Sequence, residues 1–226
     1  MNFENMLAYT KALEENNERT WFHENHAQYE QARGEFLTLL DMLKPALAEV
    51  SPELGESVLF TDSRLMMYRI PRDMRYSVGA PYYPAFRAYL SPAKKYFLPL
   101  SYYLHIDHHE CFIESGAYPW QPDDLRRLRE YILHNGDEFK RIIIDKRLHI
   151  AGETSKRVPR GFPADHPMSE WMKYKQYLCA YYFSDEDMSD FDSFVDAAKK
   201  AMMRMEPLRA FLSGAFTAGT GYSEDF

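Results

Sequence analysis

Five segments in the first half of the chain have the composition of β-strands, and brief connections separate them. They cover residues 57–61, 64–70, 85–90, 100–107 and 110–115. Their Tyr, Phe, Ile and Val side chains favour a pleated, half-buried surface. Because no regular alternation of strand and helix is present, a parallel sheet built from βαβ units is disfavoured. We therefore predict an α+β fold with a mainly antiparallel sheet.

Helical periodicity surrounds this strand-rich region on both sides. Apolar residues recur at the spacing of one helix face, which predicts helices over residues 3–15, 20–50, 122–135, 137–145, 167–175 and 191–216, together with one more strand over 177–183. We expect the helices to pack on one face of the sheet.

The 226 residues contain no Gly/Ser-rich linker and no internal repeat. A hydrophobic fraction of 46% is ample for a core at this length. We therefore predict a single domain over residues 3–216. The polar, glycine-bearing segment 217–226 is expected to be a poorly ordered tail.

Charge and hydropathy exclude several classes of partner. A net charge of −7 makes nucleic acid an unlikely partner, because phosphate backbones bind net basic surfaces. No stretch approaches the roughly 18 apolar residues of a membrane span, and the first 21 residues lack the pattern of a signal peptide. Cys111 and Cys179 lie in apolar runs, so we expect free thiols and a cytoplasmic protein. The oligomeric state is left open.

Four separated motifs resemble those of a bacterial family. They read NNERTWF at 16–22, RIPRDMRYS at 69–77, YLHI at 103–106 and VPRGFPADHP at 158–167. In the same order they are similar to the motifs of the family catalogued as domain of unknown function 2461. The resemblance covers nearly the whole chain, and it implies no particular activity.

The chain departs from the family pattern after Ser77. Relatives typically carry a lysine-rich run there, whereas this chain reads VGAPYYP at 78–84 and keeps only a tyrosine of that run. If the lysines serve an anionic ligand in relatives, this chain has lost part of that site or binds a different ligand.

Arginines and tyrosines are densest in the second of these motifs and just after it. Arg69, Arg72 and Arg75 lie within seven residues around Asp73, and Tyr83 follows. Guanidinium groups bind phosphate or carboxylate through two parallel hydrogen bonds. The candidate ligand-binding residues are therefore Arg69, Arg72, Asp73, Arg75, Tyr83 and Arg160. Arg160 belongs to a second basic segment, which consists of Lys156, Arg157, Arg160, Lys173 and Lys175. In the alternative interpretation these arginines pair with Asp73 and other carboxylates and only hold the turn.

The histidines give a weaker signal. His105, His108 and His109 flank the connection between two predicted strands, where side chains need not converge, so we expect exposed turn residues and no metal site. No nucleophile elbow, phosphate-binding loop or dinucleotide motif is present. The sequence therefore predicts no cofactor, and whether the protein is an enzyme stays open.

Three functions are compatible with these observations. The first is binding of a small anionic ligand at the Arg/Tyr-lined site. The second is a non-enzymatic interaction module that uses exposed aromatic residues such as Tyr118 and Trp120. The third is a nucleic-acid accessory role for the two basic segments, against which the acidic net charge weighs.

Overall fold

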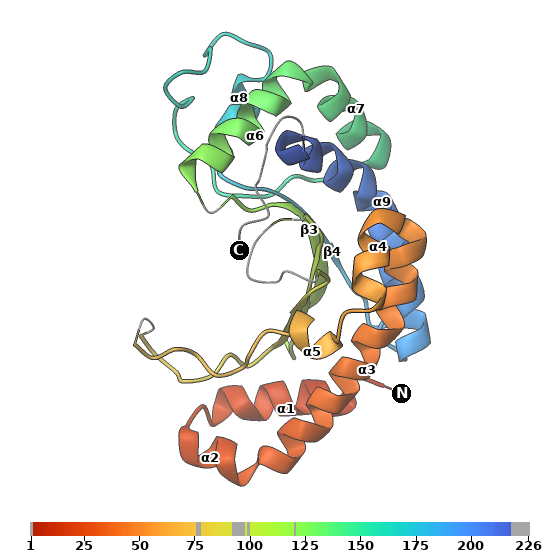
Figure 1. Cartoon of the computed structure of the whole chain (residues 1–226). Coiled ribbons are helices and arrows are strands. Elements are labelled where there is room, and N and C mark those ends of the chain that lie inside the picture. Colours follow the sequence, from red (N-terminus) through yellow and green to blue (C-terminus); the bar gives the residue numbers. More distant parts are fainter. Residues whose placement is uncertain (1, 76–77, 92–97, 99, 120, 218–226) are drawn as a thin grey trace. The chain divides into compact units, whose positions relative to one another are not determined.

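The computed structural model describes residues 2–75, 78–91, 98, 100–119 and 121–217 (Figure 1). Its helices are Glu4–Glu15 (α1), Arg19–Glu24 (α2), His26–Val50 (α3), Pro52–Leu59 (α4), Ser63–Met66 (α5), Pro122–His134 (α6), Gly136–Lys146 (α7), Ser169–Met172 (α8) and Phe191–Thr217 (α9). Its strands are Phe86–Tyr89 (β1), Tyr102–Ile106 (β2), Cys111–Ala117 (β3) and Tyr177–Tyr182 (β4).

The four strands form one antiparallel sheet in the order β1-β2-β3-β4. In the β1–β2 pair, Arg87 lies opposite His105 and Tyr89 lies opposite Tyr103. A tight turn joins β2 to β3, where the N–H of Asp107 donates to the carbonyl oxygen of Glu110 at 3.0 Å. The predicted α+β class and antiparallel sheet are thereby confirmed.

The chain divides into two compact units. Unit 1 comprises Met1–Lys94, Tyr102–Glu114 and Tyr181–Met203, and unit 2 comprises Lys95–Ser101, Ser115–Ala180 and Arg204–Phe226. The boundaries between the units fall within β3, β4 and α9. The single domain over residues 3–216 stays a prediction. Thr217 ends α9, and the rest of the predicted tail, 218–226, lies outside the described residues.

Unit 1 has its core between the sheet and the helices. Alternate residues of β1 and β2 are buried, as the two-residue period of a strand requires. The Phe86 ring packs against the rings of Tyr9 in α1 and Phe36 in α3, with centroids 6.2 and 5.5 Å away. The Tyr102 hydroxyl donates to the carbonyl oxygen of Met202 in α9 at 3.2 Å. Helices thus cover one sheet face, and the opposite face stays partly exposed.

Unit 2 is organised around the buried ring of Phe139 in α7. Its centroid lies 5.0 Å from Trp171 in α8 and 5.6 Å from Phe211 in α9. Gly116 in β3 has a φ of +137°, and a Cβ atom there would lie 2.0 Å from the carbonyl oxygen of Tyr177. The close approach of β3 to β4 therefore requires glycine at this position.

The predicted strand 57–61 is wrong, and the predicted strand 64–70 is wrong over its first residues, because helices replace these parts of the chain. Residues 57–61 belong largely to α4, which starts at Pro52 and buries Leu54 and Val58 four residues apart. That spacing is the period of a helix face. Pro52 also suits the first turn of a helix, where its missing N–H costs nothing.

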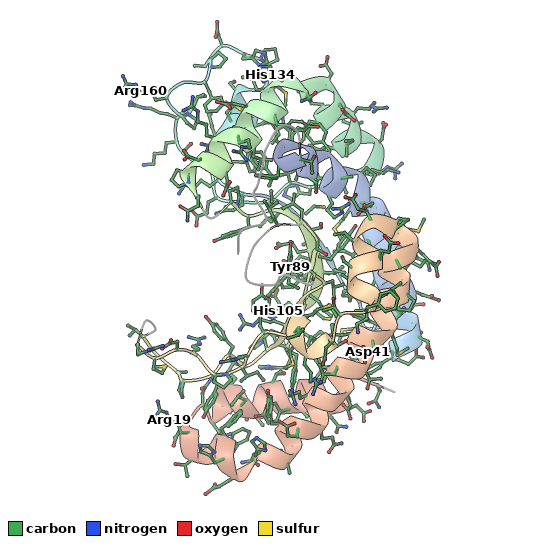
Figure 2. All side chains as sticks on the ribbon, in the orientation of Figure 1. Arg19, Asp41, Tyr89, His105, His134 and Arg160 are labelled. Carbon is green, nitrogen blue, oxygen red and sulfur yellow. The ribbon has the colours of Figure 1, made fainter. Side chains whose placement is uncertain are left out.

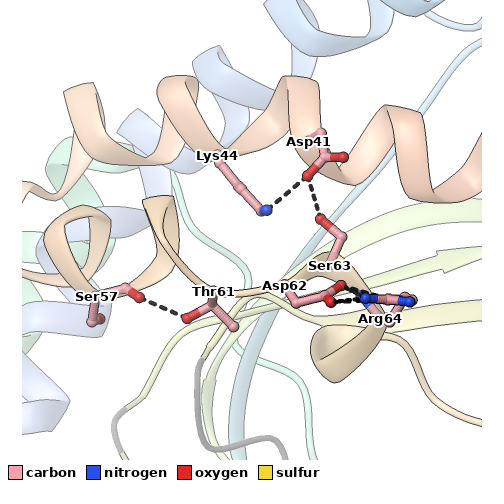
Figure 3. A network of polar contacts seen from close by, with 7 residues as sticks. All are labelled: Asp41, Lys44, Ser57, Thr61, Asp62, Ser63 and Arg64. Carbon is pink, nitrogen blue, oxygen red and sulfur yellow. Dashed lines mark hydrogen bonds and ion pairs between the residues drawn. The ribbon is translucent and has the colours of Figure 1, made fainter.

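The start of the predicted strand 64–70 is occupied by the short helix α5. The Asp62 carboxylate accepts a hydrogen bond from the backbone N–H of Arg64 at 2.9 Å, which is a helix N-cap. Figure 3 shows a second anchor, in which Asp41 Oδ1 accepts from Lys44 Nζ at 2.7 Å and from Ser63 Oγ at 2.6 Å. These local bonds outweigh the strand propensity of the residues that follow.

The predicted long helix over residues 20–50 is interrupted once. Asn25 separates α2 from α3, and its side-chain Nδ2 donates to the carbonyl oxygen of Trp21 at 2.9 Å. Asparagine competes for backbone groups in this way and favours helix ends. In the described part of the chain, no helix combines the length and the apolar composition needed to cross a membrane.

Candidate functional site

The partly exposed face of the sheet in unit 1 carries polar and aromatic side chains. Arg87 of β1 lies opposite His105 of β2, and the His105 ring stacks on Phe112 of β3 with centroids 4.9 Å apart. Tyr89 lies opposite Tyr103 in the next row. Figure 2 shows all side chains and labels Tyr89 and His105 on these strands.

Two extended segments, residues 67–72 and 81–83, pair with each other and form a ribbon that brings further residues to this face. The N–H of Tyr68 donates to the carbonyl oxygen of Arg87 at 2.8 Å, which continues the sheet beyond β1. Farther along, the N–H of Arg72 donates to Pro81 O at 2.8 Å, and the N–H of Tyr83 donates to Ile70 O at 2.9 Å. Backbone pairing of these two segments therefore places Arg72 close to Tyr83.

The side chain of Asn17 fixes this ribbon to the turn between α1 and α2. Its Nδ2 donates to the carbonyl oxygen of Tyr82 at 3.1 Å, and its Oδ1 accepts from the N–H of Tyr82 at 3.0 Å. The Tyr82 ring stacks on Phe22 of α2, with centroids 4.2 Å apart and planes at 10°. One side-chain amide thus satisfies both backbone groups of Tyr82, and the aromatic stack adds buried area.

Two arginine side chains pack on one tyrosine ring. Cζ of Arg72 lies 3.8 Å and Cζ of Arg87 lies 3.9 Å from the centroid of the Tyr83 ring. Both distances are well within the range of a cation–π contact. The two Cζ atoms are therefore less than about 8 Å apart, which is within the screening length of physiological salt. The two positive charges consequently repel each other.

No carboxylate compensates this repulsion within the described residues. None of the ion pairs found there involves Arg72 or Arg87. Nε of each guanidinium is buried and lacks a hydrogen-bond partner. A buried donor without an acceptor costs free energy, so the arrangement suits an anion that would supply both acceptor atoms and negative charge.

The side chains of Tyr68 and Tyr103 lie beside Arg87, and the Glu114 carboxyl lies near Tyr103. Burial raises the pKa of Tyr103 to about 12, against the opposing effect of Arg87, and burial likewise raises the pKa of Tyr68. Both hydroxyls therefore stay protonated near neutral pH and remain hydrogen-bond donors. Burial also raises the pKa of Glu114 to about 7, and the Glu114 charge contributes to the raised pKa of Tyr103.

A hydrogen-bonded chain runs along β2. The Asp107 carboxylate can only accept, so His105 Nε2 donates to its Oδ2 at 2.8 Å. Nδ1 of a neutral His105 then accepts from the Tyr103 hydroxyl at 3.4 Å. The predicted exposure of the turn histidines is wrong for His105 and His108, whose side chains are only 15% and 16% exposed. Stacking on Phe112 covers His105.

The structure brings only part of the predicted site together. Arg72 and Tyr83 meet, as described, but Asp73 pairs with Arg75 at 2.6 Å in an exposed position. Arg69 is exposed as well. Arg160 is an exposed residue of unit 2, and its place in the site stays a prediction. The alternative in which arginines hold the turn by pairing with Asp73 thus describes Arg75.

Arg87, Tyr68, Tyr103 and Glu114 were not among the predicted site residues. The sequence did contain a signal for Arg87 and Tyr103, because each lies between apolar or aromatic residues of a predicted strand. A charged residue at the alternate position of a strand only indicates a partly exposed face. The long-range pairing that carries these residues to Tyr83 is not encoded in local spacing.

The protein has an α+β fold, and the partly exposed face of its antiparallel sheet carries the arginine and tyrosine side chains of the candidate site. The chain belongs to the family described as Conserved hypothetical protein (DUF2461), whose family model matches residues 5–211. No curated protein matched the chain, and no solved structure matched it.

Proposed function

We propose that the protein binds a small ligand bearing a phosphate or carboxylate group, and that Arg72 and Arg87 bind this group. The observation that carries the proposal is the approach of two guanidinium groups to the Tyr83 ring without a carboxylate partner in the described part of unit 1. An oxyanion would offset the repulsion and accept the unused N–H groups. Bidentate hydrogen bonding to such an anion is the characteristic chemistry of arginine.

The neighbouring groups complete a site for an anion. The Tyr68 and Tyr103 hydroxyls near Arg87 are neutral, because burial raises their pKa values, so neither adds a negative charge that would oppose an anion. Glu114 is partly protonated at neutral pH because its pKa is about 7. Protonation removes a negative charge that would otherwise repel the ligand, so we expect tighter anion binding below pH 7 than above it.

The two other functions have less support. Among the aromatic residues of an interaction surface, Tyr118 is exposed, and Trp120 lies outside the described residues. In the second basic segment, Lys173 pairs with Glu170 at 2.6 Å and Lys175 pairs with Glu153 at 2.9 Å. These pairs reduce the positive charge available for nucleic acid.

We also infer that the protein works in a reducing compartment such as the cytoplasm. Cys111 and Cys179 are both buried and form no disulfide, and burial raises the pKa of the Cys111 thiol. A protonated, buried thiol is unreactive. Thiol titration of the denatured, non-reduced protein tests this inference: two free groups are expected, and finding none contradicts it.

Calorimetric titration with inorganic phosphate and with citrate at low salt tests the anion site. We expect saturable binding to the unmodified protein. Arg72→Gln and Arg87→Gln should each weaken binding by about 10- to 100-fold, which corresponds to one hydrogen-bonded charged contact. The matched control is Arg75→Gln, since Arg75 is exposed and already paired with Asp73.

The outcome separates the three functions. Equal binding by all three variants, or no binding by the unmodified protein, would contradict the anion site. Binding of a single-stranded oligonucleotide that is insensitive to Arg87→Gln would favour the nucleic-acid role. If no anion or oligonucleotide binds, the interaction module becomes the better explanation.

A further inference from the structure

A second group of side chains in unit 1 lies at the turn between β2 and β3. His108 and His109 belong to the turn, and Glu14 belongs to the last turn of α1. Nε2 of His108 and Nε2 of His109 each lie 2.9 Å from Oε2 of Glu14. Within the described residues these are the side chains whose ligand atoms converge as a metal site requires.

The separation of the ligand atoms suits a tetrahedral metal ion. The three atoms lie within 4.8 Å of one another. Zinc binds nitrogen and oxygen ligands at about 2.0–2.2 Å, so neighbouring ligand atoms around it are about 3.3 Å apart. The observed 2.9 Å contacts are therefore close to the spacing of a metal-bound set. Small rotations of exposed side chains would suffice to admit the ion.

The backbone of the turn is held independently of the side chains of these three residues. Asp107 Oδ1 accepts the N–H of His109 at 2.7 Å and the N–H of Glu110 at 2.9 Å. Nδ1 of His108 is buried without a partner, so the polar contact of its ring is the one made through Nε2. The turn thus presents both Nε2 atoms to Glu14 before any ion binds.

Electrostatics at the end of α1 favours a cation. The C-terminal end of a helix carries partial negative charge, and here Glu14 and Glu15 add two carboxylates, with no basic residue in the last turn. The His108 and His109 rings are only 3.8 Å apart between centroids. Two imidazolium ions at that distance repel each other, whereas one divalent cation bound to neutral imidazoles avoids that repulsion.

We propose that Glu14, His108 and His109 form a binding site for a divalent first-row transition metal, with zinc as the representative ion. Two imidazoles and one carboxylate are ligands that such metals accept, whereas magnesium and calcium prefer oxygen. Three protein ligands leave a fourth position for water. A bound ion would join α1 to the β2–β3 turn, and Glu14 and His109 are exposed enough to admit it.

This site goes beyond the anion site, and the sequence alone predicts no metal here. Glu14 and His109 are 95 residues apart in the chain. Adjacent histidines also do not follow the spacing of a helical zinc motif. Only the packing of α1 beside the β2–β3 turn brings the three residues together.

Zinc titration of tag-free, chelator-treated protein tests the proposal. We expect one Zn²⁺ per chain by calorimetry, and no comparable binding of Mg²⁺ or Ca²⁺. Zinc at a hundredfold excess over its Kd should raise the melting temperature by roughly 5–10 °C. Co²⁺ should give the visible absorption of a tetrahedral site, which a simple hydrogen-bonded arrangement cannot produce.

Three variants and one control decide the assignment. Glu14→Gln, His108→Gln and His109→Gln should each weaken zinc binding by at least about tenfold. The matched control is His26→Gln, since His26 is an exposed histidine beside a single glutamate, Glu30. Because His108 is largely buried, the fold of the His108→Gln variant is checked by circular dichroism. If that variant does not fold, the result for His109→Gln decides, since His109 is exposed. Absence of stoichiometric zinc binding, or equal binding by Glu14→Gln, His109→Gln and the control, would overturn the proposal.

Discussion

Arg209 in unit 2 and the pair Arg72 and Arg87 in unit 1 differ in what their guanidinium groups contact. Nε and Nη2 of Arg209 donate to the two carboxylate oxygens of Glu206, each at 2.7 Å. Its Nη1 donates to the carbonyl oxygen of Leu100 at 2.9 Å. Arg72 and Arg87 instead pack on an aromatic ring, and Nε of each is buried without an acceptor.

The difference shows how the fold treats an arginine with a structural role. Glu206 lies one helical turn before Arg209 and supplies a bidentate partner, and Leu100 supplies a further acceptor. Arg129 is intermediate, since its Nε lacks a partner but its Nη2 donates to Tyr174 O at 2.8 Å. Arg72 and Arg87 have no carboxylate partner within the described residues, and Nε of each lacks an acceptor, so we expect a ligand to supply both.

The largest effect is expected at the satisfied arginine. Arg209→Ala should destabilise the protein by about 3–5 kcal/mol, because it leaves the mostly buried Glu206 carboxylate without its partner. The urea midpoint of unfolding measures this loss. Arg75→Ala serves as the control, since the exposed Arg75–Asp73 pair should give no measurable change. If Arg209→Ala lowered the free energy of unfolding by no more than Arg72→Ala does, the proposed difference between these arginines would be contradicted.

The next effect tests the environment of the open sheet face in unit 1. Burial raises the pKa of Glu114 from its ordinary 4.5 to about 7. The folded state therefore binds more protons than the unfolded state between these pH values, so stability falls as pH rises through this window. The loss amounts to at most about 3.5 kcal/mol, at roughly 1.4 kcal/mol per pKa unit.

Replacement of the ionisable group isolates this contribution. Glu114→Gln should remove most of the stability loss between pH 4.5 and pH 7, and it should be more stable than the unmodified protein at pH 8. Denaturant unfolding at several pH values provides the measurement. The same pH dependence in both proteins would show that the Glu114 carboxyl is not held in a desolvated position.

The strands were easier to predict than the ribbon beside them. Period-two burial in β1, β2 and β3 follows from alternating residues, and the sequence predicted all three. Residues 57–61 and 64–66 were misassigned, because helix caps such as Asp62 outweigh propensity in short segments. A six-residue window cannot distinguish these alternatives.

The site could be predicted only where its residues are close in the chain. Arg72 and Tyr83 lie in one segment that is rich in arginine and tyrosine, and both were predicted from the sequence. Arg87 reaches Tyr83 because backbone pairing with Tyr68 fixes the ribbon to β1. Glu14 and His109 meet through helix packing across 95 positions. Contacts of this kind depend on tertiary packing, which local periodicity does not report.

A smaller effect should follow from loosening the ribbon that carries Arg72 and Tyr83. Asn17→Ala removes both hydrogen bonds to the backbone of Tyr82. We expect a loss of about 1–3 kcal/mol, since partly buried backbone groups would lose their partners. Asn17→Asp is the matched variant, because it keeps the acceptor for the Tyr82 N–H and loses only the donor. Phosphate affinity should fall more in Asn17→Ala than in Asn17→Asp if the ribbon positions Arg72.

The smallest effect on stability is expected at Arg72 and Arg87. Its size distinguishes ligand-binding arginines from structural ones. Without an anion, Arg72→Gln and Arg87→Gln should each cost only about 0.5–1 kcal/mol, the lower end of the range for a cation–π contact. With phosphate at a hundredfold excess over Kd, the unmodified protein should gain about 2.7 kcal/mol, and both variants should lose this gain. Denaturant unfolding with and without phosphate gives both numbers. A loss of several kcal/mol in the absence of anion would place Arg72 or Arg87 in the same structural class as Arg209, since only a guanidinium with buried internal partners leaves such a deficit.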